Sequence, residues 1–324
     1  MRFFVCTVLA FSFVAIFTAK DAFAAQDFKK WLGELRTEAA QKGISRKIID
    51  IALPDTMQPI PRVLELDRKQ PEGTTTLDSY LQKVVTADRV KKGREKARAH
   101  GSILRKVEEA YRVDRSVIVA LWGIETSYGR NTGGYDVVNA LATLAYDGRR
   151  GAFFRSELFN ALKILDEGHT HPRSMKGSWA GAMGQSQFMP SSFLRFAVDF
   201  NNDGRRDIWE TEADVFASAA NYLASSGWRK GAPCAREVKL PKSFSAGPLG
   251  VDSERTLQYW HDKGVRLANG KPVPYEGENH ASIVQPNGAG TTAYLVYENY
   301  KTIMKWNKST YFATAVCTLS DKVR

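Results

Sequence analysis

Cysteine and histidine are scarce in this chain of 324 residues, and it has no internal repeat and no low-complexity tract. Three cysteines are too few for a small scaffold held by several disulfides. The absence of a repeat excludes solenoids and propellers. His169 and His171 lie in a proline-containing loop with no cysteine or carboxylate at useful metal spacing, so we interpret them as solvated loop residues.

The longest apolar run of the chain lies at its N-terminus. Arg2 precedes an almost uninterrupted apolar stretch over residues 3–19, and small residues follow at 22–25. This order is typical of a secretory signal peptide, and cleavage near Ala25 would remove residues 1–25. An uncleaved anchor is the alternative, but the stretch is marginally short for a membrane span. We therefore expect an exported, soluble protein of the periplasm, with no stable membrane span after cleavage.

Positive charge outweighs negative charge in the chain as a whole. Removal of the leader leaves 44 Lys and Arg against 34 Asp and Glu, and a basic helical segment runs through residues 91–98. Such a surplus suits an anionic polymer, which means nucleic acid, anionic lipid or an acidic cell-wall glycan. Export argues against nucleic acid as the partner. The sequence gives no indication of protein partners.

Two cysteines, Cys234 and Cys317, remain after the leader is removed. In an oxidising compartment they can form one disulfide that closes a long loop. Two buried free thiols fit the sequence equally well. The pairing therefore stays open at this level.

Helical periodicity dominates the chain on both sides of a short strand-rich region. Residues 237–240 and 291–297 alternate like strands, with Gly- and Pro-rich joints between them. We therefore predict a mainly α protein with a small β-containing insertion. Its predicted parts are an N-terminal helical subdomain (26–100), a helical core (101–231), a small β-containing subdomain (232–296) and a C-terminal helical return to the core (297–324).

A single acidic residue stands at the end of a strongly apolar helical run. Residues 117–124 are apolar or glycine, Glu125 follows, and the polar turn 126–130 comes directly after it. A carboxylate is costly in such surroundings unless it is paired, hydrogen-bonded or protonated. A carboxyl that stays protonated near neutral pH is what a general acid for a glycosidic oxygen requires. Glu125 is therefore our candidate catalytic residue.

A stretch of small residues, at 177–186, forms a second motif. Glycine, alanine and serine dominate it, so that backbone can approach a ligand closely. Ser178 and Gln187 add hydrogen-bonding groups to this surface. Tight packing of helices is the alternative use of such a stretch, and the motif alone does not decide between the two.

Taken together, these segments resemble the membrane-bound lytic transglycosylase B family of peptidoglycan lytic transglycosylases. The resemblance covers roughly residues 30–320, nearly the whole mature chain. It implies a lysozyme-like helical catalytic core that acts on peptidoglycan glycan strands. The segments that carry it are 123–130, 140–144, 177–192, 220–222, 227–228 and 306–313.

The resemblance also implies roles for single residues. Glu125 matches the sole catalytic acid and base, and Ser178 matches a serine that hydrogen-bonds near it. Trp306 and Phe312 fall where the family commonly has tyrosine, so stacking on a sugar is expected there without a hydroxyl contact. The other substrate contacts implied are Tyr128, Gln187 and Asn307.

One carboxylate is enough when the substrate supplies the nucleophile, whereas an ordinary glycosidase needs two. Protonated Glu125 would donate to the β-1,4 oxygen between N-acetylmuramic acid and N-acetylglucosamine. The resulting carboxylate would take a proton from the muramic C6 hydroxyl, which attacks C1 to give a 1,6-anhydro ring. This chemistry requires no cofactor.

Two other functions are compatible with the sequence. A hydrolytic muramidase would use a second carboxylate to activate water, and Asp136, Asp147 and Glu157 fall between the two motifs. Their polar neighbours favour helix ends or surface pairs instead. A non-catalytic glycan-binding protein is the other alternative, and the intact motif at Glu125 argues against it.

Residues 199–210 fit the twelve-residue calcium loop of the EF-hand without a mismatch. Gly204 takes the sharp turn, and Asp207 would act through water. The role expected for calcium is structural, and a polar loop that binds nothing is the alternative. The expected ligands are Asp199, Asn201, Asp203, the carbonyl of Arg205, and Glu210.

Overall fold

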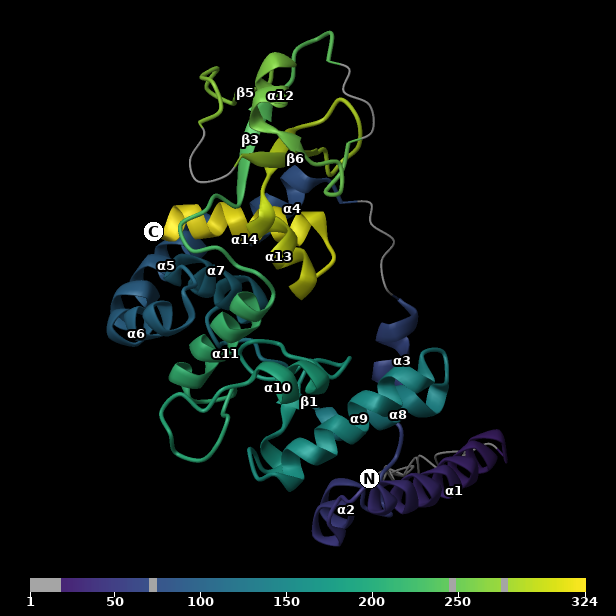
Figure 1. Cartoon of the computed structure of the whole chain (residues 1–324). Coiled ribbons are helices and arrows are strands. Elements are labelled where there is room, and N and C mark those ends of the chain that lie inside the picture. Colours follow the sequence, from purple (N-terminus) through teal and green to yellow (C-terminus); the bar gives the residue numbers. More distant parts are fainter. Residues whose placement is uncertain (1–18, 70–74, 245–248, 275–278) are drawn as a thin grey trace, which may run out of the picture.

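The computed structural model describes residues 19–69, 75–244, 249–274 and 279–324, and the predicted signal peptide lies outside this range up to residue 18. The helices form a stack with a small sheet at one end and α1 and α2 at the other (Figure 1). No helix in the described part of the chain has both the length and the apolar character that a membrane crossing requires. The first helices in this order are α1 (Ala19–Gln41), α2 (Arg46–Ala52), α3 (Pro61–Arg68), α4 (Leu77–Val84), α5 (Ala87–Ala99), α6 (Gly101–Tyr111) and α7 (Arg115–Thr126).

The second half of the chain alternates between helices and short strands. After α7 come β1 (Tyr135–Asp136), α8 (Val137–Asp147), α9 (Gly151–Asp166), β2 (Lys176–Gly177), α10 (Pro190–Phe196) and α11 (Glu212–Ser225). The sheet region holds β3 (Ala235–Lys239), β4 (Arg255–Thr256), α12 (Leu257–Asp262), β5 (Arg266–Leu267), β6 (His280–Val284) and β7 (Ala293–Val296). The chain then ends with α13 (Glu298–Trp306) and α14 (Thr310–Val323).

The first hydrophobic core joins the N-terminal helices to α8 and α9. Phe28, Leu32 and Leu35 recur at helical spacing on α1 and are buried against this core. Leu141 of α8 and Leu158 of α9 belong to the same cluster. The N-terminal helices therefore bury one apolar face each and form a base beneath α8 and α9.

The second core surrounds α7. Every residue from Ser116 to Gly123 is buried, so α7 is apolar on all sides rather than on one stripe. Helices α5, α6, α11 and α14 contact it. This explains why its sequence reads as an unbroken apolar run, and it fixes the direction in which the end of α7 points.

The sheet has five strands in the order β4-β6-β7-β3-β5, and every pair is antiparallel. All four residues of β7 are buried, because it is the central strand and both of its faces belong to hydrophobic clusters. On the sheet, α12 buries Trp260, whose indole N–H donates to the carbonyl of Ala281 at 2.8 Å. A mainly α fold with a small β-containing insertion is thus confirmed.

A disulfide joins the base of the sheet to the last helix. Cys234 lies directly before β3, Cys317 lies in α14, and their Cα atoms are 5.7 Å apart. The structure therefore contains the disulfide and not the two free thiols that the sequence left as an equal alternative.

Candidate active site

Glu125 occupies the last turn of α7, where the chain leaves the core. Ser127 and Tyr128 both take left-handed backbone conformations, with φ of 51° and 63°. Their amides return to the carbonyls of Gly123 and Trp122, which closes the helix in the manner of a Schellman motif. Two consecutive non-glycine residues with positive φ are costly, and such strain concentrates at functional sites. The turn holds Glu125 at a fixed end of a rigid helix.

One indole anchors the Glu125 carboxyl. Nε1 of Trp306, the last residue of α13, donates a hydrogen bond of 2.8 Å to Oε1 of Glu125. Burial raises the pKa of Glu125 from its ordinary 4.5 to about 7, and the hydrogen bond from Trp306 opposes part of that rise. A substantial share of the molecules therefore carries a protonated Glu125 at neutral pH, as a general acid requires.

The three carboxylates considered as a second catalytic acid are all engaged in structural contacts. Asp136 accepts the amide of Asn139 at 3.0 Å and caps α8. Asp147 pairs with Arg68 at 2.8 Å. Glu157 is buried and accepts both the amide and the hydroxyl of Ser191, at 2.8 and 2.6 Å.

No carboxylate in the described part of the chain contributes to the pKa shift of Glu125; its causes are burial and Trp306. A second acid within reach of Glu125 would raise that pKa further by charge repulsion. The arrangement is therefore that of one isolated carboxyl.

The small-residue motif folds into a compact loop in which its polar groups are used. The Ser178 hydroxyl accepts the amides of Ala180 and Ala182, at 3.3 and 3.0 Å. Gln187 has a φ of 49°, and its amide group donates to the carbonyls of Thr132 and Gly184. Both residues thus shape the loop. In the described part of the chain, the Ser178 hydroxyl keeps its O–H to donate and Gln187 keeps its Oε1 to accept.

Glycine allows this loop to pack closely on the chain that follows α7. A Cβ on Gly133, whose φ is 91°, would lie 2.1 Å from the carbonyl oxygen of Gly177. Gln185 links the loop to α7 directly, because its Oε1 accepts the indole N–H of Trp122 at 2.7 Å. Sequence reasoning did not single out Gln185, since a buried glutamine carries no periodic signal.

Aromatic rings gather around Trp306, which packs against both hydrophobic cores. Its ring centroid lies 4.8 Å from that of Tyr222 and 5.2 Å from that of Phe188. Tyr222 is half-buried, and its hydroxyl donates to the carbonyl of Lys305. Asn307, the next residue after Trp306, is exposed. The boundary between the two hydrophobic cores therefore holds Glu125, a cluster of aromatic rings around Trp306 and the exposed side-chain amide of Asn307.

Tyr80 is a neighbour of Glu125 that the motifs did not indicate. Burial raises the pKa of Tyr80, and the negative charge of Glu125 adds to the rise, so Tyr80 lies within electrostatic range of that carboxyl. The Tyr80 ring lies 5.8 Å from that of Tyr311, whose hydroxyl donates to Oδ1 of Asn287 at 2.6 Å. Helix α4 thus adds a tyrosine near the candidate acid.

Two residues expected to contact substrate are buried. Phe312 is 5% exposed and belongs to the core around α7. Tyr128 is also 5% exposed; its hydroxyl donates to the carbonyl of Arg89 at 2.7 Å and its ring meets the edge of Trp122. Neither ring has an open face for stacking on a sugar, so the expectation for these two residues is corrected to a packing role.

Comparison with known proteins bears directly on this geometry. Residues 27–321 match the Transglycosylase SLT domain family. The chain belongs to this family. The family resemblance carried by the sequence motifs is thereby confirmed.

Individual relatives of this SLT-domain protein support the same grouping. Membrane-bound lytic murein transglycosylase B of Escherichia coli K12 is 32% identical over 246 residues, which are 75% of this chain and 66% of that relative, just under two thirds of its length. SltB3 of Pseudomonas aeruginosa, solved in complex with NAG-anhNAM-pentapeptide, is 41% identical with a TM-score of 0.88 and covers 91% of this chain and 79% of that one. Slt35 of E. coli, solved in complex with calcium, is 30% identical with a TM-score of 0.77, over 90% and 92% of the two chains. The lysozyme-like helical fold expected for this SLT-domain protein is consistent with these neighbours.

The EF-hand-like loop of this SLT-domain protein is ordered by its own side chains. Asp199 accepts the amides of Asp203 and Gly204, and Asn201 accepts that of Asp203. Hydrogen bonds from Asn201 and from the amide of Arg205 lower the pKa of Asp203, which keeps it ionised. Asp199, Asn201 and Asp203 thus form the oxygen-rich turn that a hard cation prefers.

The expected last ligand of the loop, Glu210, does not lie with the other carboxylates of this turn. Within the described ranges, no three His, Cys, Asp or Glu side chains form a group that could hold a metal ion, so Glu210 does not complete a cluster with Asp199 and Asp203. The amides of Trp209 and Glu210 bond to Asp207 instead, at 2.9 and 3.0 Å. The first half of the loop fits calcium, and the second half would have to move to supply a bidentate carboxylate.

Proposed function

We propose that this protein is an exported peptidoglycan lytic transglycosylase of the periplasm. It cleaves the β-1,4 bond between N-acetylmuramic acid and N-acetylglucosamine and leaves a 1,6-anhydromuramic end. The observation that carries the proposal is one isolated carboxyl, Glu125, whose pKa burial raises to about 7. Similarity to SltB3, which was solved with NAG-anhNAM-pentapeptide, supports both the polymer and the anhydro product.

The proton travels on one oxygen of Glu125. Because Oε1 accepts the indole N–H of Trp306, Oε2 carries the acidic proton. In the first step Oε2 donates to the glycosidic oxygen while the bond from that oxygen to C1 breaks. In the second step Oε2 accepts the proton of the muramic C6 hydroxyl while O6 bonds to C1. The carboxyl ends protonated, ready for another turnover.

The surrounding residues orient the sugar rather than react with it. We infer that Trp306 presents an aromatic surface and that Asn307 binds from the exposed end of α13. Ser178 donates its O–H to a sugar oxygen, and Oε1 of Gln187 accepts a sugar hydroxyl or amide. Tyr222 adds to the cluster of aromatic rings around Trp306. Orientation of the C6 hydroxyl over C1 takes the place of a second carboxylate, because an intramolecular nucleophile needs no base-activated water.

The decisive measurement is mass spectrometry of the muropeptides that the purified protein releases from peptidoglycan. Anhydro ends, one water lighter than reducing ends, are expected. Reducing ends would establish a hydrolytic muramidase instead. A protein that sediments with peptidoglycan and releases no soluble fragments would be a glycan-binding protein.

The pH profile tests the role of Trp306. Activity requires protonated Glu125, so kcat/KM is expected to fall as pH rises through about 7. Trp306→Phe removes the hydrogen bond that lowers the pKa of Glu125, so the alkaline limb should move to higher pH while kcat falls roughly tenfold from lost anchoring. Trp228→Phe is the matched control, because that indole donates to Asp114 instead. If the alkaline limb of the pH profile stays where it is in Trp306→Phe, the proposed effect of Trp306 on the pKa of Glu125 is wrong.

We propose further that calcium binds the loop 199–210 and stabilises the fold, with no part in the chemistry. The oxygen-rich turn and the calcium complex of Slt35 support this. Calcium is expected to raise the melting temperature by a few degrees relative to chelator, because a ligand stabilises the state that binds it. Asp199→Asn with Asp203→Asn should remove the difference, and magnesium serves as the ionic control. Equal melting temperatures of the wild type in calcium and chelator would refute calcium binding.

A further inference from the structure

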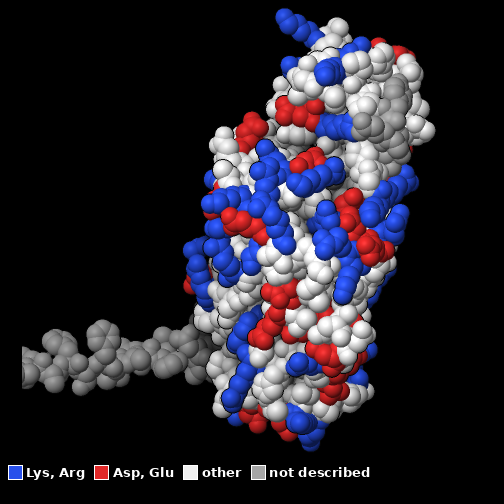
Figure 2. All heavy atoms as spheres, turned by 90° about the vertical axis from the view of Figure 1, so that its left-hand side faces the viewer, with Lys and Arg blue, Asp and Glu red and all other residues white. Residues whose placement is uncertain are grey.

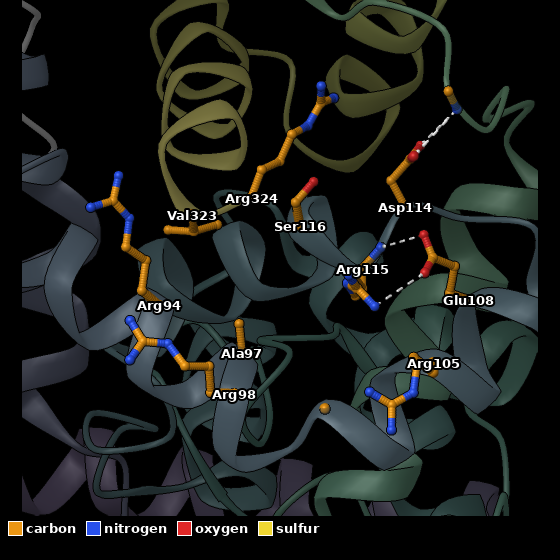
Figure 3. A pocket seen from close by; sticks show the side chains of 12 residues that line it. Arg94, Ala97, Arg98, Arg105, Glu108, Asp114, Arg115, Ser116, Val323 and Arg324 are labelled. Atoms are coloured by element: carbon orange, nitrogen blue, oxygen red, sulfur yellow. Dashed lines mark hydrogen bonds and ion pairs between the residues drawn. The ribbon is translucent and has the colours of Figure 1, made fainter.

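A basic hollow lies at the opposite end of α7 from Glu125. It has a volume of about 730 Å³ and is bounded by α5, α6, the start of α7 and the end of α14 (Figure 3). Five arginines line it: Arg94, Arg98, Arg105, Arg115 and Arg324. The basic segment 91–98 of the sequence, for which the proposed chemistry has no use, supplies two of them.

The two side-chain carboxylates that line this hollow, Glu108 and Asp114, are already engaged. Asp114 accepts the indole N–H of Trp228 at 2.9 Å and the amide of Gly231 at 3.1 Å. Glu108 accepts the amide of Arg115, and it pairs with the guanidinium of Arg115 at 4.0 Å and with Nζ of Lys230 at 3.7 Å. These contacts hold both carboxylates against the wall on which they lie.

Three of the arginines, Arg94 and Arg98 on α5 and Arg105 on α6, are uncompensated in the described part of the chain. In the described part of the chain, no carboxylate pairs with the guanidinium of Arg94, Arg98 or Arg105; Arg94 donates to the carbonyl of Lys322. An adjoining hollow of about 650 Å³ shares Arg94 and Arg98 and adds two lysines, Lys91 and Lys322, against one carboxylate, Glu95. Figure 2 shows Lys and Arg side chains gathered across the middle of this face. The hollow is therefore a region of positive potential with hydrogen-bond donors to spare.

We propose that this hollow binds an acidic peptide carrying several carboxylates, and that its physiological ligand is a peptide stem of peptidoglycan. This assignment of the ligand rests on the proposed function. Figure 3 shows Arg94 and Arg98 on one wall and Arg105 and Arg115 on the other. Guanidinium groups on separate walls match carboxylates spaced along a chain better than one compact anion, and each fork fits a carboxylate. The volume suits a ligand of a few residues.

The hollow is separate from the catalytic end but close to it. Arg115 and Glu125 lie ten residues apart on one helix, which corresponds to about 15 Å. Because α7 is buried along this length, the hollow does not open into the catalytic end through the interior. A peptide stem bound at Arg98 and Arg105 would hold the protein on peptidoglycan while Glu125 cleaves a glycan strand nearby.

Direct binding of a sugar-free peptide tests the proposal. The full chain with Glu125→Gln is titrated with a fluorescent acidic pentapeptide, and Arg98→Glu with Arg105→Glu is expected to weaken binding at least tenfold. The control pair is Arg46→Glu with Lys47→Glu, exposed residues of α2 that change the net charge equally. It should weaken binding less than twofold. All four positions are exposed, and melting temperatures verify folding.

Equal weakening in both pairs would overturn the proposal, because only net charge would matter. Displacement of the peptide by inorganic phosphate at a lower concentration than by unlabelled peptide would also overturn it, in favour of a phosphate site. In active protein, the Arg98 and Arg105 pair should slow release from intact peptidoglycan several-fold and leave cleavage of peptide-free glycan unchanged. Absence of anhydro products from the wild type would refute the proposed function while leaving the peptide titration interpretable.

Discussion

Glu125→Gln is expected to lose at least about a thousandfold of anhydromuropeptide release while the protein stays folded. The amide cannot donate a proton to the glycosidic oxygen, and it cannot take one from the C6 hydroxyl. Its carbonyl oxygen can still accept the indole N–H of Trp306, so the geometry of the site should persist. The measurement is the initial rate of muropeptide release, quantified by mass spectrometry. Near-normal turnover would remove Glu125 from the chemistry.

Stability measurements distinguish a loss of catalysis in Glu125→Gln from a loss of folding. The folded-state pKa of Glu125, about 7, lies above its ordinary value, so its contribution to stability is greatest at low pH and declines as pH rises to 7. Glutamine carries no such penalty, and the variant should melt no lower than the wild type at pH 8. Glu157→Gln is the contrasting control, because it disturbs the buried contacts to Ser191. That variant should lose about 1–2 kcal/mol of stability and keep its turnover per folded molecule.

The raised pKa follows from the way α7 is built. A helix that is apolar on every face must be surrounded, and α5, α6, α11 and α14 surround it. Glu125 is the first charged residue after the apolar run. The left-handed turn at Ser127 and Tyr128 leaves its side chain only partly exposed to solvent. The burial that raises the pKa of Glu125 thus comes from the packing around α7. The hydrogen bond that lowers this pKa comes from Trp306 of α13.

The local pattern was sufficient to predict the helical class and to single out Glu125 as a carboxyl at the end of a buried helix. Periodicity reports which face of a segment is buried, and an acidic residue at the end of an all-apolar run stands out against it. The same reasoning identified the strands at 237–240 and 291–297, because alternation is equally local. These signals need no knowledge of what packs against them.

Contacts between distant segments carry no such signal. Trp306 reaches Glu125 across 181 residues of sequence, and only the family resemblance placed it near the site. Tyr80 and Tyr222 look like ordinary apolar-face aromatics until α4 and α11 are placed. Conversely, Tyr128 and Phe312 are aromatic residues in the right motifs whose rings are covered by the core around α7. Whether an aromatic ring packs or binds depends on tertiary exposure, which the sequence does not contain.

Removal of the disulfide is expected to give the largest loss of stability. The Cys234–Cys317 bond closes a loop of 83 residues that contains the whole sheet, and such a link restricts the unfolded chain strongly. Cys234→Ala with Cys317→Ala should lower the free energy of unfolding by about 2–4 kcal/mol. Chemical denaturation, followed by circular dichroism, measures the difference.

Reduction provides the matching control. Wild-type protein in reducing agent should approach the stability of the double variant, and the double variant itself should be indifferent to the reagent. Helix α14 holds Cys317 and packs directly on α7, so loosening of the sheet is transmitted to the helix that carries Glu125. We therefore expect the double variant to inactivate at a lower temperature than the wild type while its rate at low temperature is retained. A double variant within about 0.5 kcal/mol of the wild type would mean that packing of β3 and β7 on α14 holds the sheet without the bond.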